Sequence, residues 1–506
     1  IAGSDSDENP YTFDIQAEGT SLKEIKIMGN DTEISDGDNT PSTADFTDFG
    51  TVWDLNVTDS KSQTFYITNT DVGVVQISGS PKVSLSGSSD FTVTQQPAEL
   101  IYYEDTTWFT IKFDPSGGGV QTAVVSIENN DTDEDPYNFT IQGTGRGFGY
   151  SGSAGPGCIT VTNTNNSGAG SLRDAISTCN SNANIDTILF NIAGNAPKTI
   201  SINSALSITD DGIMICGNTQ PAGTYTGPRP KVRVSHSSGL INGFEINASN
   251  VELHGLTATS FKHDGINISN GEEYIVIKNC EIIDNEYDGC DNEGADNSLF
   301  AYSFFGLRAD SVTLASNWYG GLIFTNNSDN NRVHACAFGT NLYYGLMIEE
   351  SDSNYITGCT FGTTANDACD TRDNFYDGIS IRCQSDYNRI GGTSAGLGNV
   401  MAYNHYSGVD VDMGSSAPCN TQPCHYNTIR GNSIFCNDNG GIGLTNGGND
   451  NYAAPVITGG DADSVWGTAA AGDIIDVYIS ENGIGCGSDN QGAQYIGWTY
   501  ADGSGN

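Results

Sequence analysis

Five tyrosines recur at one position of a repeated segment, and such a column of aromatic rings could bind a sugar chain. The repeat reads Asn-x-Tyr-x-Gly-apolar, and its five clear copies contain Tyr287, Tyr319, Tyr343, Tyr376 and Tyr406. A sixth copy, NDNGGI (437–442), has Asn in place of Tyr, and Trp318 lies beside Tyr319. If the copies stack, the rings either stiffen the protein by packing on one another or form a platform for an extended glycan.

Acidic residues supply candidate calcium ligands at two places. Asp264, Asp288 and Asp377 flank the tyrosine column, where carboxylates could accept hydrogen bonds from sugar hydroxyls or bind Ca²⁺. A separate loop, NNDTDEDP (129–136), carries acidic residues at alternate positions, namely Asp131, Asp133 and Asp135. This alternation is typical of calcium loops, but the bidentate Glu of an EF-hand is absent, and a solvated turn is the alternative.

The spacing of the repeat predicts stacked coils of parallel strands. The Gly of the motif recurs every 24 to 33 residues, and the sequence after it continues apolar-x-apolar, as a strand with one inward face does. A second pattern, seen in NRVHACAF (331–338) and NYITGCTF (354–361), predicts a second strand, and the variable stretch leaves room for a third. We therefore predict a right-handed parallel β-helix over residues 158–450.

Stacked coils place equivalent residues in columns. The motif Asn predicts a hydrogen-bonded amide ladder at one corner, from Asn285, Asn317, Asn341, Asn374, Asn404 and Asn437. The motif Gly is expected to supply a positive φ at the same corner. Cys280, Cys336 and Cys359 fall in one inward column, where buried thiols are favoured over a metal site.

The first part of the chain contains a longer repeat. DEDPYNFTIQGTG (133–145) matches DENPYTFDIQAEG (7–19) at an offset of 126 residues, so residues 1–20 are expected to be the last strand of a preceding copy of the domain 21–147. Alternating segments such as TFYITNT and TWFTIKFDP predict a β-sandwich. The runs FYITNTDVGVVQISG and FDPSGGGVQTAVVSIENN resemble the choice-of-anchor variant of the ASPM–SPD-2–Hydin immunoglobulin-like domains. This resemblance implies a stalk module of exported bacterial proteins, without chemistry of its own.

A linker (148–157) leads to GAGSLRDAI (168–176), which predicts a short helix. The segment resembles the CSLREA-type cap at the N-terminal end of exported bacterial β-helices. Leu172 and Ile176, four residues apart, would cover strand edges that otherwise invite aggregation. Residues 451–506 resemble a small immunoglobulin-like module that follows such helices, and we expect this module to be truncated. The expected fold is thus all-β: an Ig-like sandwich, a right-handed parallel β-helix and a partial second sandwich.

The same β-helix fold hosts pectate lyases and polygalacturonases, so an enzymatic alternative must be weighed. Asp210, Asp211 and His254 are the nearest candidates, but the paired carboxylates and the basic partner that such reactions need are not evident. The cations of the repeat region are expected to be scattered, with no two at one motif position: Lys262, Lys278, Arg308, Arg332, Arg372, Arg382, Arg389 and Arg430. No catalytic residue is assigned.

Composition narrows the class of protein. The 506 residues include 63 Gly and carry a formal charge of −43, which argues against nucleic acid or an anionic membrane as a partner. The sequence contains no apolar run of 18 residues, so it predicts no membrane-spanning segment. It also shows no signal peptide, and we expect it to be an interior piece of a longer protein. Cys419 and Cys424, among 13 cysteines, predict a local disulfide and an oxidising compartment.

These patterns favour a secreted or cell-surface structural and adhesive protein that binds a glycan through the tyrosine column. No cofactor is required, although Ca²⁺ fits the acidic loops. Two alternatives stay open: a polysaccharide lyase or glycoside hydrolase of pectin-lyase fold, and the subunit of an extracellular filament.

Overall fold

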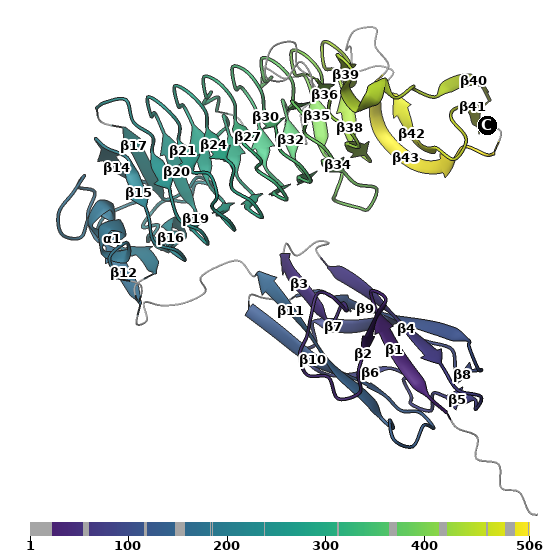
Figure 1. Ribbon diagram of the computed structural model, residues 1–506. Coiled ribbons are helices and arrows are strands. Elements are labelled where there is room, and N and C mark those ends of the chain that lie inside the picture. Colours follow the sequence, from purple (N-terminus) through teal and green to yellow (C-terminus); the bar gives the residue numbers. More distant parts are fainter. Residues whose placement is uncertain are drawn as a thin grey trace, which may run out of the picture. The chain divides into compact units, whose positions relative to one another are not determined.

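The computed structural model divides the chain into two compact units, Ile1–Ser151 and Gly152–Asn506 (Figure 1). It describes residues 23–53, 60–115, 119–146, 157–182, 184, 186–236, 238–310, 313–363, 372–413, 423–461, 464–480, 491–503 and 505. The expected strand of a preceding repeat (1–20) and linker residues 148–156 lie outside the described residues.

The first unit is a sandwich of two mainly antiparallel sheets. One sheet has the order β2 (Thr32–Ile34), β1 (Ile25–Gly29), β4 (Lys61–Asn69), β9 (Thr106–Phe113) and β7 (Phe91–Gln95). The other has the order β3 (Asp48–Trp53), β11 (Tyr137–Arg146), β10 (Gly119–Ile127) and β6 (Ser84–Gly87), and a small pair joins β5 (Val75–Gln76) to β8 (Leu100–Ile101).

Alternation along these strands explains the sandwich core. Every second residue of β9 is buried, and the inward residues of both sheets form one apolar cluster. Phe65 and Phe109, paired across β4 and β9, stack with ring centroids 5.3 Å apart. The predicted sandwich pattern is therefore confirmed, because side chains of period two fill the space between two sheets.

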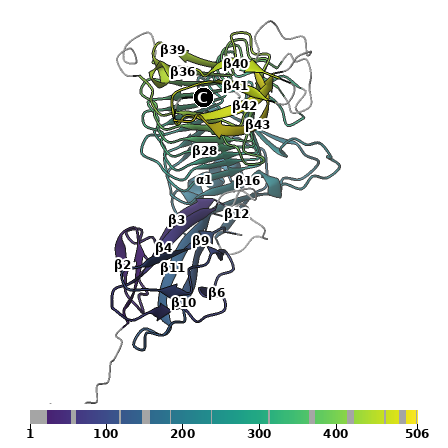
Figure 2. The same ribbon diagram turned by 90° about the vertical axis from the view of Figure 1, so that its right-hand side faces the viewer.

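The second unit is a right-handed parallel β-helix, whose coils rise one above another (Figure 1, Figure 2). The first helix sheet contains, in the described residues, β12 (Cys158–Val161), β13 (Thr187–Phe190), β16 (Met214–Cys216), β19 (Glu252–His254), β22 (Val276–Lys278), β25 (Leu299–Ala301), β28 (Arg332–His334), β31 (Tyr355–Thr357), β34 (Arg389–Gly391) and β37 (Thr428–Arg430). The second contains β14 (Lys198–Ile202), β17 (Val232–His236), β20 (Leu256–Thr259), β23 (Glu281–Ile283), β26 (Phe304–Phe305), β29 (Ala337–Phe338), β32 (Thr360–Phe361), β35 (Val400–Ala402) and β38 (Ser433–Phe435). The third contains β15 (Leu206–Ile208), β18 (Phe244–Ile246), β21 (Ile266–Ile268), β24 (Cys290–Glu293), β27 (Leu322–Thr325), β30 (Leu346–Glu349), β33 (Ile379–Arg382), β36 (Val409–Asp412) and β39 (Ile442–Thr445).

From β13 onward each coil gives one short strand to each helix sheet, as the three-strand prediction requires, whereas β12 is followed by a helix. One detail of the prediction was wrong. The stretch 331–338 holds two strands, β28 and β29, and not one, because the chain turns a corner at Ala335, where φ is +50°. In the next coil Gly358, with φ +61°, makes the same turn between β31 and β32.

The predicted Asn ladder is confirmed at the corner between the second and third helix sheets. The amide Nδ2 of each Asn donates to Oδ1 of the next, over 3.0 Å from Asn285 to Asn317 and 2.8 Å from Asn404 to Asn437. The three bonds between these two, from Asn317 to Asn341, from Asn341 to Asn374 and from Asn374 to Asn404, measure 3.0, 2.9 and 2.9 Å. These side chains are buried, so each amide finds inside the protein the partners that it gives up in water.

The role expected for the motif Gly was wrong. Gly321, Gly345 and Gly378 do not have positive φ, but a Cβ at Gly321 would lie 2.6 Å from the carbonyl oxygen of Gly345. At Gly378 a Cβ would lie 2.7 Å from the carbonyl oxygen of Gly408. Glycine is needed here because the backbone of the adjoining coil comes too close for any side chain.

Inward columns fill the interior of the β-helix. Phe305, Phe338 and Phe361 stack in successive coils with centroids 4.8 and 4.7 Å apart. Cys280 and Cys336 are buried thiols, as predicted, and burial raises the pKa of Cys280 to about 12. A thiol of such high pKa stays protonated and acts as a small apolar residue.

Helix α1 (Leu172–Cys179) confirms the predicted helix near the start of the β-helix. Ser171 caps it by accepting the N–H of Asp174, and Leu172 and Ile176 are buried in the core of the first coils. At the other end, β40 (Val456–Gly460) pairs with β41 (Val465–Thr468), and β42 (Ile474–Ser480) pairs with β43 (Gly492–Tyr500). Arg430 of the last coils donates to Asp476 of β42, so this hairpin lies against the end of the β-helix.

Candidate functional site

The five predicted tyrosines do form a column beside the Asn ladder. Their rings stack on one another, with successive centroids 5.4, 4.4, 5.0 and 4.9 Å apart from Tyr287 to Tyr406. His263 extends the column, 4.9 Å from Tyr287. Because each inner ring has a neighbour on both sides, the column exposes ring edges and hydroxyls, and its ring faces are covered.

A second line of side chains runs along the same corner, one residue before each tyrosine. Trp318, Leu342 and Phe375 belong to successive coils, and their exposed fractions are 58%, 44% and 49%. Phe375 packs against His405, with ring centroids 5.1 Å apart, whereas Trp318 has no aromatic partner among the described residues. We call the tyrosine column together with Trp318, Leu342 and Phe375 the aromatic corner.

The flanking aspartates face inward, contrary to expectation. Asp264 accepts the backbone N–H of Asp288, and Asp288 accepts that of Gly320, over 3.0 and 2.7 Å. Asp377 accepts the N–H of Ser407. Burial raises the pKa of Asp288 well above its ordinary value and that of Asp377 to about 7. These carboxyl groups therefore join consecutive coils, and they are not presented to a ligand.

The loop with the predicted calcium ligands is held by hydrogen bonds within itself and to β1. Asp131 is buried and accepts the N–H of Ile25, while Asp135 accepts the N–H of Asn129. Burial raises the pKa of Asp131, and Asp133 hydrogen-bonds to it. Among the described residues no group of three His, Cys, Asp or Glu side chains is arranged to hold a metal ion. A calcium site here stays a prediction.

The disulfide expected between Cys419 and Cys424 is not formed. Cys424 is a buried cysteine with a free thiol, whose Sγ donates to the carbonyl of Asp412, and Cys419 lies outside the described residues. Cys383 and Cys436 do take part in disulfide bonds. Sequence proximity misled here, because the turn of the coil buries Cys424 in the core.

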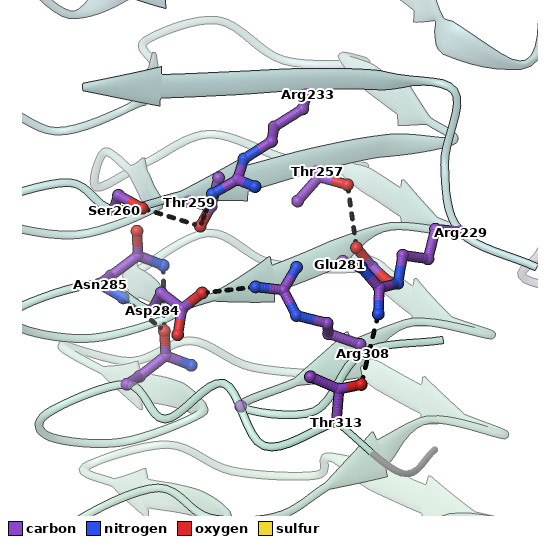
Figure 3. A network of polar contacts seen from close by, with 12 residues as sticks. Arg229, Arg233, Thr257, Thr259, Ser260, Glu281, Asp284, Asn285, Arg308 and Thr313 are labelled. Carbon is purple, nitrogen blue, oxygen red and sulfur yellow. Dashed lines mark hydrogen bonds and ion pairs between the residues drawn. The ribbon is translucent and has the colours of Figure 1, made fainter. Parts of the chain in front are cut away.

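Two of the eight cations share a column, contrary to expectation. Arg332 and Arg389 occupy one column of the first helix sheet, on either side of Tyr355, with their guanidinium carbons 6.0 and 5.0 Å from its ring centroid. A second group of cations, Arg229, Arg233 and Arg308, lies beside the second helix sheet (Figure 3). The sequence pattern did not reveal that group, because Arg229 and Arg233 come from coils before the clear repeat.

Polar contacts surround this second group, and Glu281 and Asp284 take part in them (Figure 3). Glu281 accepts the hydroxyl of Thr257 over 3.0 Å and the N–H of Ala309 over 2.7 Å, and burial raises its pKa. Arg308 donates to Asp284 over 2.9 Å. Glu281 is 1% exposed, so its carboxyl group cannot reach a polymer and serves to hold the loop at Ala309.

The enzyme candidates named from the sequence are not brought together as a catalytic pair. Asp211 accepts the N–H of Ser249, whereas His254 is buried and its Nε2 lies 2.8 Å from Glu252. The contact of Asp211 joins neighbouring coils, whereas His254 and Glu252 belong to the same strand, β19.

Comparison with known proteins supports the fold. The family model described as "Right handed beta helix region" matches residues 242–416. No curated protein sequence matches the chain. Within the described residues, no helix combines the length and apolar character needed to cross a bilayer.

Solved structures that resemble the chain do so weakly. An alginate lyase from Paenibacillus sp. str. FPU-7 is 14% identical, with 57% of this chain and 99% of that one covered and a TM-score of 0.34. PfbA, a surface adhesin of Streptococcus pneumoniae, is 14% identical, with 54% and 86% covered and a TM-score of 0.27. A protein of unknown function from Porphyromonas gingivalis W83 is 18% identical, with 26% and 49% covered and a TM-score of 0.17, so this chain spans about half of its length. At such identities and TM-scores, these likenesses carry no argument about activity.

Proposed function

We propose that this chain belongs to a secreted or cell-surface protein with an adhesive role, whose rigid β-helix binds glycan at the aromatic corner. The observation that carries the proposal is the run of exposed apolar side chains over three successive coils, Trp318, Leu342 and Phe375. Contiguous exposed apolar surface on a soluble protein marks an interaction site. The disulfide-bonded Cys383 and Cys436 support an oxidising compartment.

The stacking geometry assigns different parts to the two lines of residues. Tyr319 and Tyr343 cover each other's faces, so a sugar ring cannot lie flat on either of them. Among the described residues the indole of Trp318 has no such neighbour, and its face is available to the C–H face of a pyranose. The tyrosine hydroxyls beside it then accept or donate hydrogen bonds to the sugar, which sets the direction of the chain.

The proposal is tested by glycan-array binding of Trp318→Ala and of the double variant Tyr343→Ala/Tyr376→Ala. In Trp318→Ala the loss of a Trp contact that the glycan would bury should cost about 2 kcal/mol of binding free energy, so Kd should rise by about 30-fold. The matched control is Tyr387→Ala/Tyr426→Ala, which removes a stacked pair with centroids 5.0 Å apart. Binding that survives both test variants, or that falls equally in the control, would overturn the proposal.

Self-association is a second candidate, supported by a separate observation. In the last two hairpins Ile457, Trp466, Ile496 and Trp498 are each at least half exposed. Apolar faces of this kind on paired strands favour packing against another sheet. Light scattering of the chain beside the variant Ile457→Ser/Trp498→Ser tests this candidate. A monomer in both samples at high concentration contradicts it.

A further inference from the structure

A cavity of about 360 Å³ lies on the second unit, against the outer side of the second helix sheet. The segment 217–231, which begins with the short helix η1 (Gly217–Thr219), contributes one wall. Phe304 of β26 and Tyr302, in the turn between β25 and β26, contribute the other. The volume is at the lower end of the range of small-ligand pockets, about 300–1,000 Å³.

The lining combines aromatic, amide and cationic groups. Tyr225, Tyr302 and Phe304 are its aromatic side chains, Asn218 and Asn279 its amides, and Arg229 and Lys231 its cations. Phe304 is paired in register with Glu281, so the cavity adjoins the network of Figure 3. Aromatic walls with a few polar groups of this kind suit a small polar ligand that has one apolar face.

The charge of this place is unusual for the chain. Lys231 donates to the carbonyl of Asn218 over 2.8 Å, and no described carboxylate pairs with it. In a chain with 62 acidic and 19 basic residues, a cavity whose described lining holds two cations, Arg229 and Lys231, and no carboxylate is unusual. Their position beside a cavity indicates an anionic ligand.

The wall formed by segment 217–231 is already fixed in place. Arg229 donates to Asp310 over 2.5 Å and to Thr313 over 3.3 Å, which joins this segment to the loop after β26. Pro228 and Pro230 on either side restrict the backbone further. A ligand therefore does not have to order this wall when it binds, and the affinity is not reduced by that entropy.

We infer that this cavity binds a single anionic sugar unit, one that carries a carboxylate or a sulfate group. Lys231 binds the anion, beside Arg229, which is already paired with Asp310. Tyr302 and Phe304 pack on the C–H face of the ring, and Asn279 hydrogen-bonds its hydroxyls. The inference rests on the proposed glycan binding and adds a ligand class at a second place. No bond is made or broken in this binding step.

Isothermal titration calorimetry with four probes tests the inference: glucuronate, glucose 6-sulfate, glucose and inorganic sulfate. We expect one of the two anionic sugars to bind at least about 10-fold more tightly than both glucose and inorganic sulfate, with an affinity that falls as salt rises. The better of the two identifies the anion. Failure of both anionic sugars to bind overturns the inference, and so does equal binding of inorganic sulfate.

Variants locate the binding. Lys231→Met keeps the apolar stem and removes the charge, so the affinity for the anionic sugar should fall by about 10- to 100-fold. Lys231→Arg should retain it, which excludes a collapsed wall as the cause. The matched control is Lys198→Met, because Lys198 likewise donates to a backbone carbonyl, that of Ala193. An equal loss in Lys198→Met, or no loss in Lys231→Met, refutes the site.

The outcome is separable from that of the proposed function. Trp318→Ala should leave titration of the anionic sugar unchanged, and Lys231→Met should leave array binding of neutral glycans unchanged. If only the anionic sugar is found to bind, the cavity stands without the aromatic corner. If an effect of Trp318→Ala appears in the titration, the anionic sugar binds at the aromatic corner, and the cavity is refuted as its site.

Discussion

Replacing Asn341 by Ala removes the middle of the Asn ladder and should destabilise the β-helix by about 3 kcal/mol, because three hydrogen bonds are lost at about 1 kcal/mol net each. The Asn341 amide Nδ2 donates to Asn374 over 2.9 Å and to the carbonyl of Phe305 over 3.2 Å. Its Oδ1 accepts from Asn317 over 3.0 Å. All three partners keep another bond, so no group is orphaned and no larger loss is expected.

A matched control separates burial from the number of hydrogen bonds. Asn247 also makes three side-chain bonds, to Ser207, to Glu245 and from Ser269, but it is exposed. Water replaces these bonds in the variant, so Asn247→Ala should change stability by less than about 0.5 kcal/mol. Urea unfolding followed by circular dichroism measures both variants, with equal m values as the condition for comparison. Equal losses in the two, or a loss below about 1 kcal/mol for Asn341→Ala, would refute the reasoning.

Three further predictions concern other parts of the unit. Tyr343→Ala removes the ring pairs with Tyr319 and Tyr376 in the adjoining coils, besides the contact with Tyr344 in its own coil, and should cost about 1–3 kcal/mol of unfolding free energy. Tyr387→Ala removes one pair between coils and should cost roughly half of that. Leu172 lies on the buried face of α1, so Leu172→Ala should lower the free energy of unfolding by about 2–5 kcal/mol. The variant should also increase light scattering, because strand edges at this end become exposed, whereas Ser177→Ala, at an exposed position, should do neither. Burial raises the pKa of Asp291 to about 8, so between about pH 4 and 8 the folded chain holds a proton that the unfolded chain has lost. The melting temperature should therefore fall as pH rises through that window, and Asp291→Asn should flatten the fall; an unchanged slope contradicts the assignment.

Periodic features of the fold were predictable from the sequence. Residues that recur once per coil must stack, because parallel strands lie about 4.8 Å apart, and the Asn ladder follows directly from that spacing. Helix α1 was predictable for a different reason, since the segment GAGSLRDAI and its apolar pair Leu172 and Ile176 are local signals. Neither prediction needed knowledge of the loops.

Features that depend on the distance between coils were not predictable. The motif Gly was expected to need a positive φ, but what excludes a Cβ at Gly345 is the carbonyl of Gly378 in the next coil. Likewise, the register that sets Arg233 beside Thr257, and Thr257 beside Glu281, requires the coil lengths before the clear repeat begins. A motif shows which residues are equivalent, but it does not show how closely the next coil packs on them.

The same spacing limits where a ligand can bind on this β-helix. Planar aromatic residues in one column, about 4.8 Å apart, are close to ring-stacking distance, so an unbroken column such as Tyr319, Tyr343 and Tyr376 covers its own faces. A binding face becomes available only where a column changes residue type, as beside Trp318, or where a long segment leaves the coil, as at the cavity next to Lys231. Regular columns thus stabilise the solenoid, and we expect specific recognition at the interruptions.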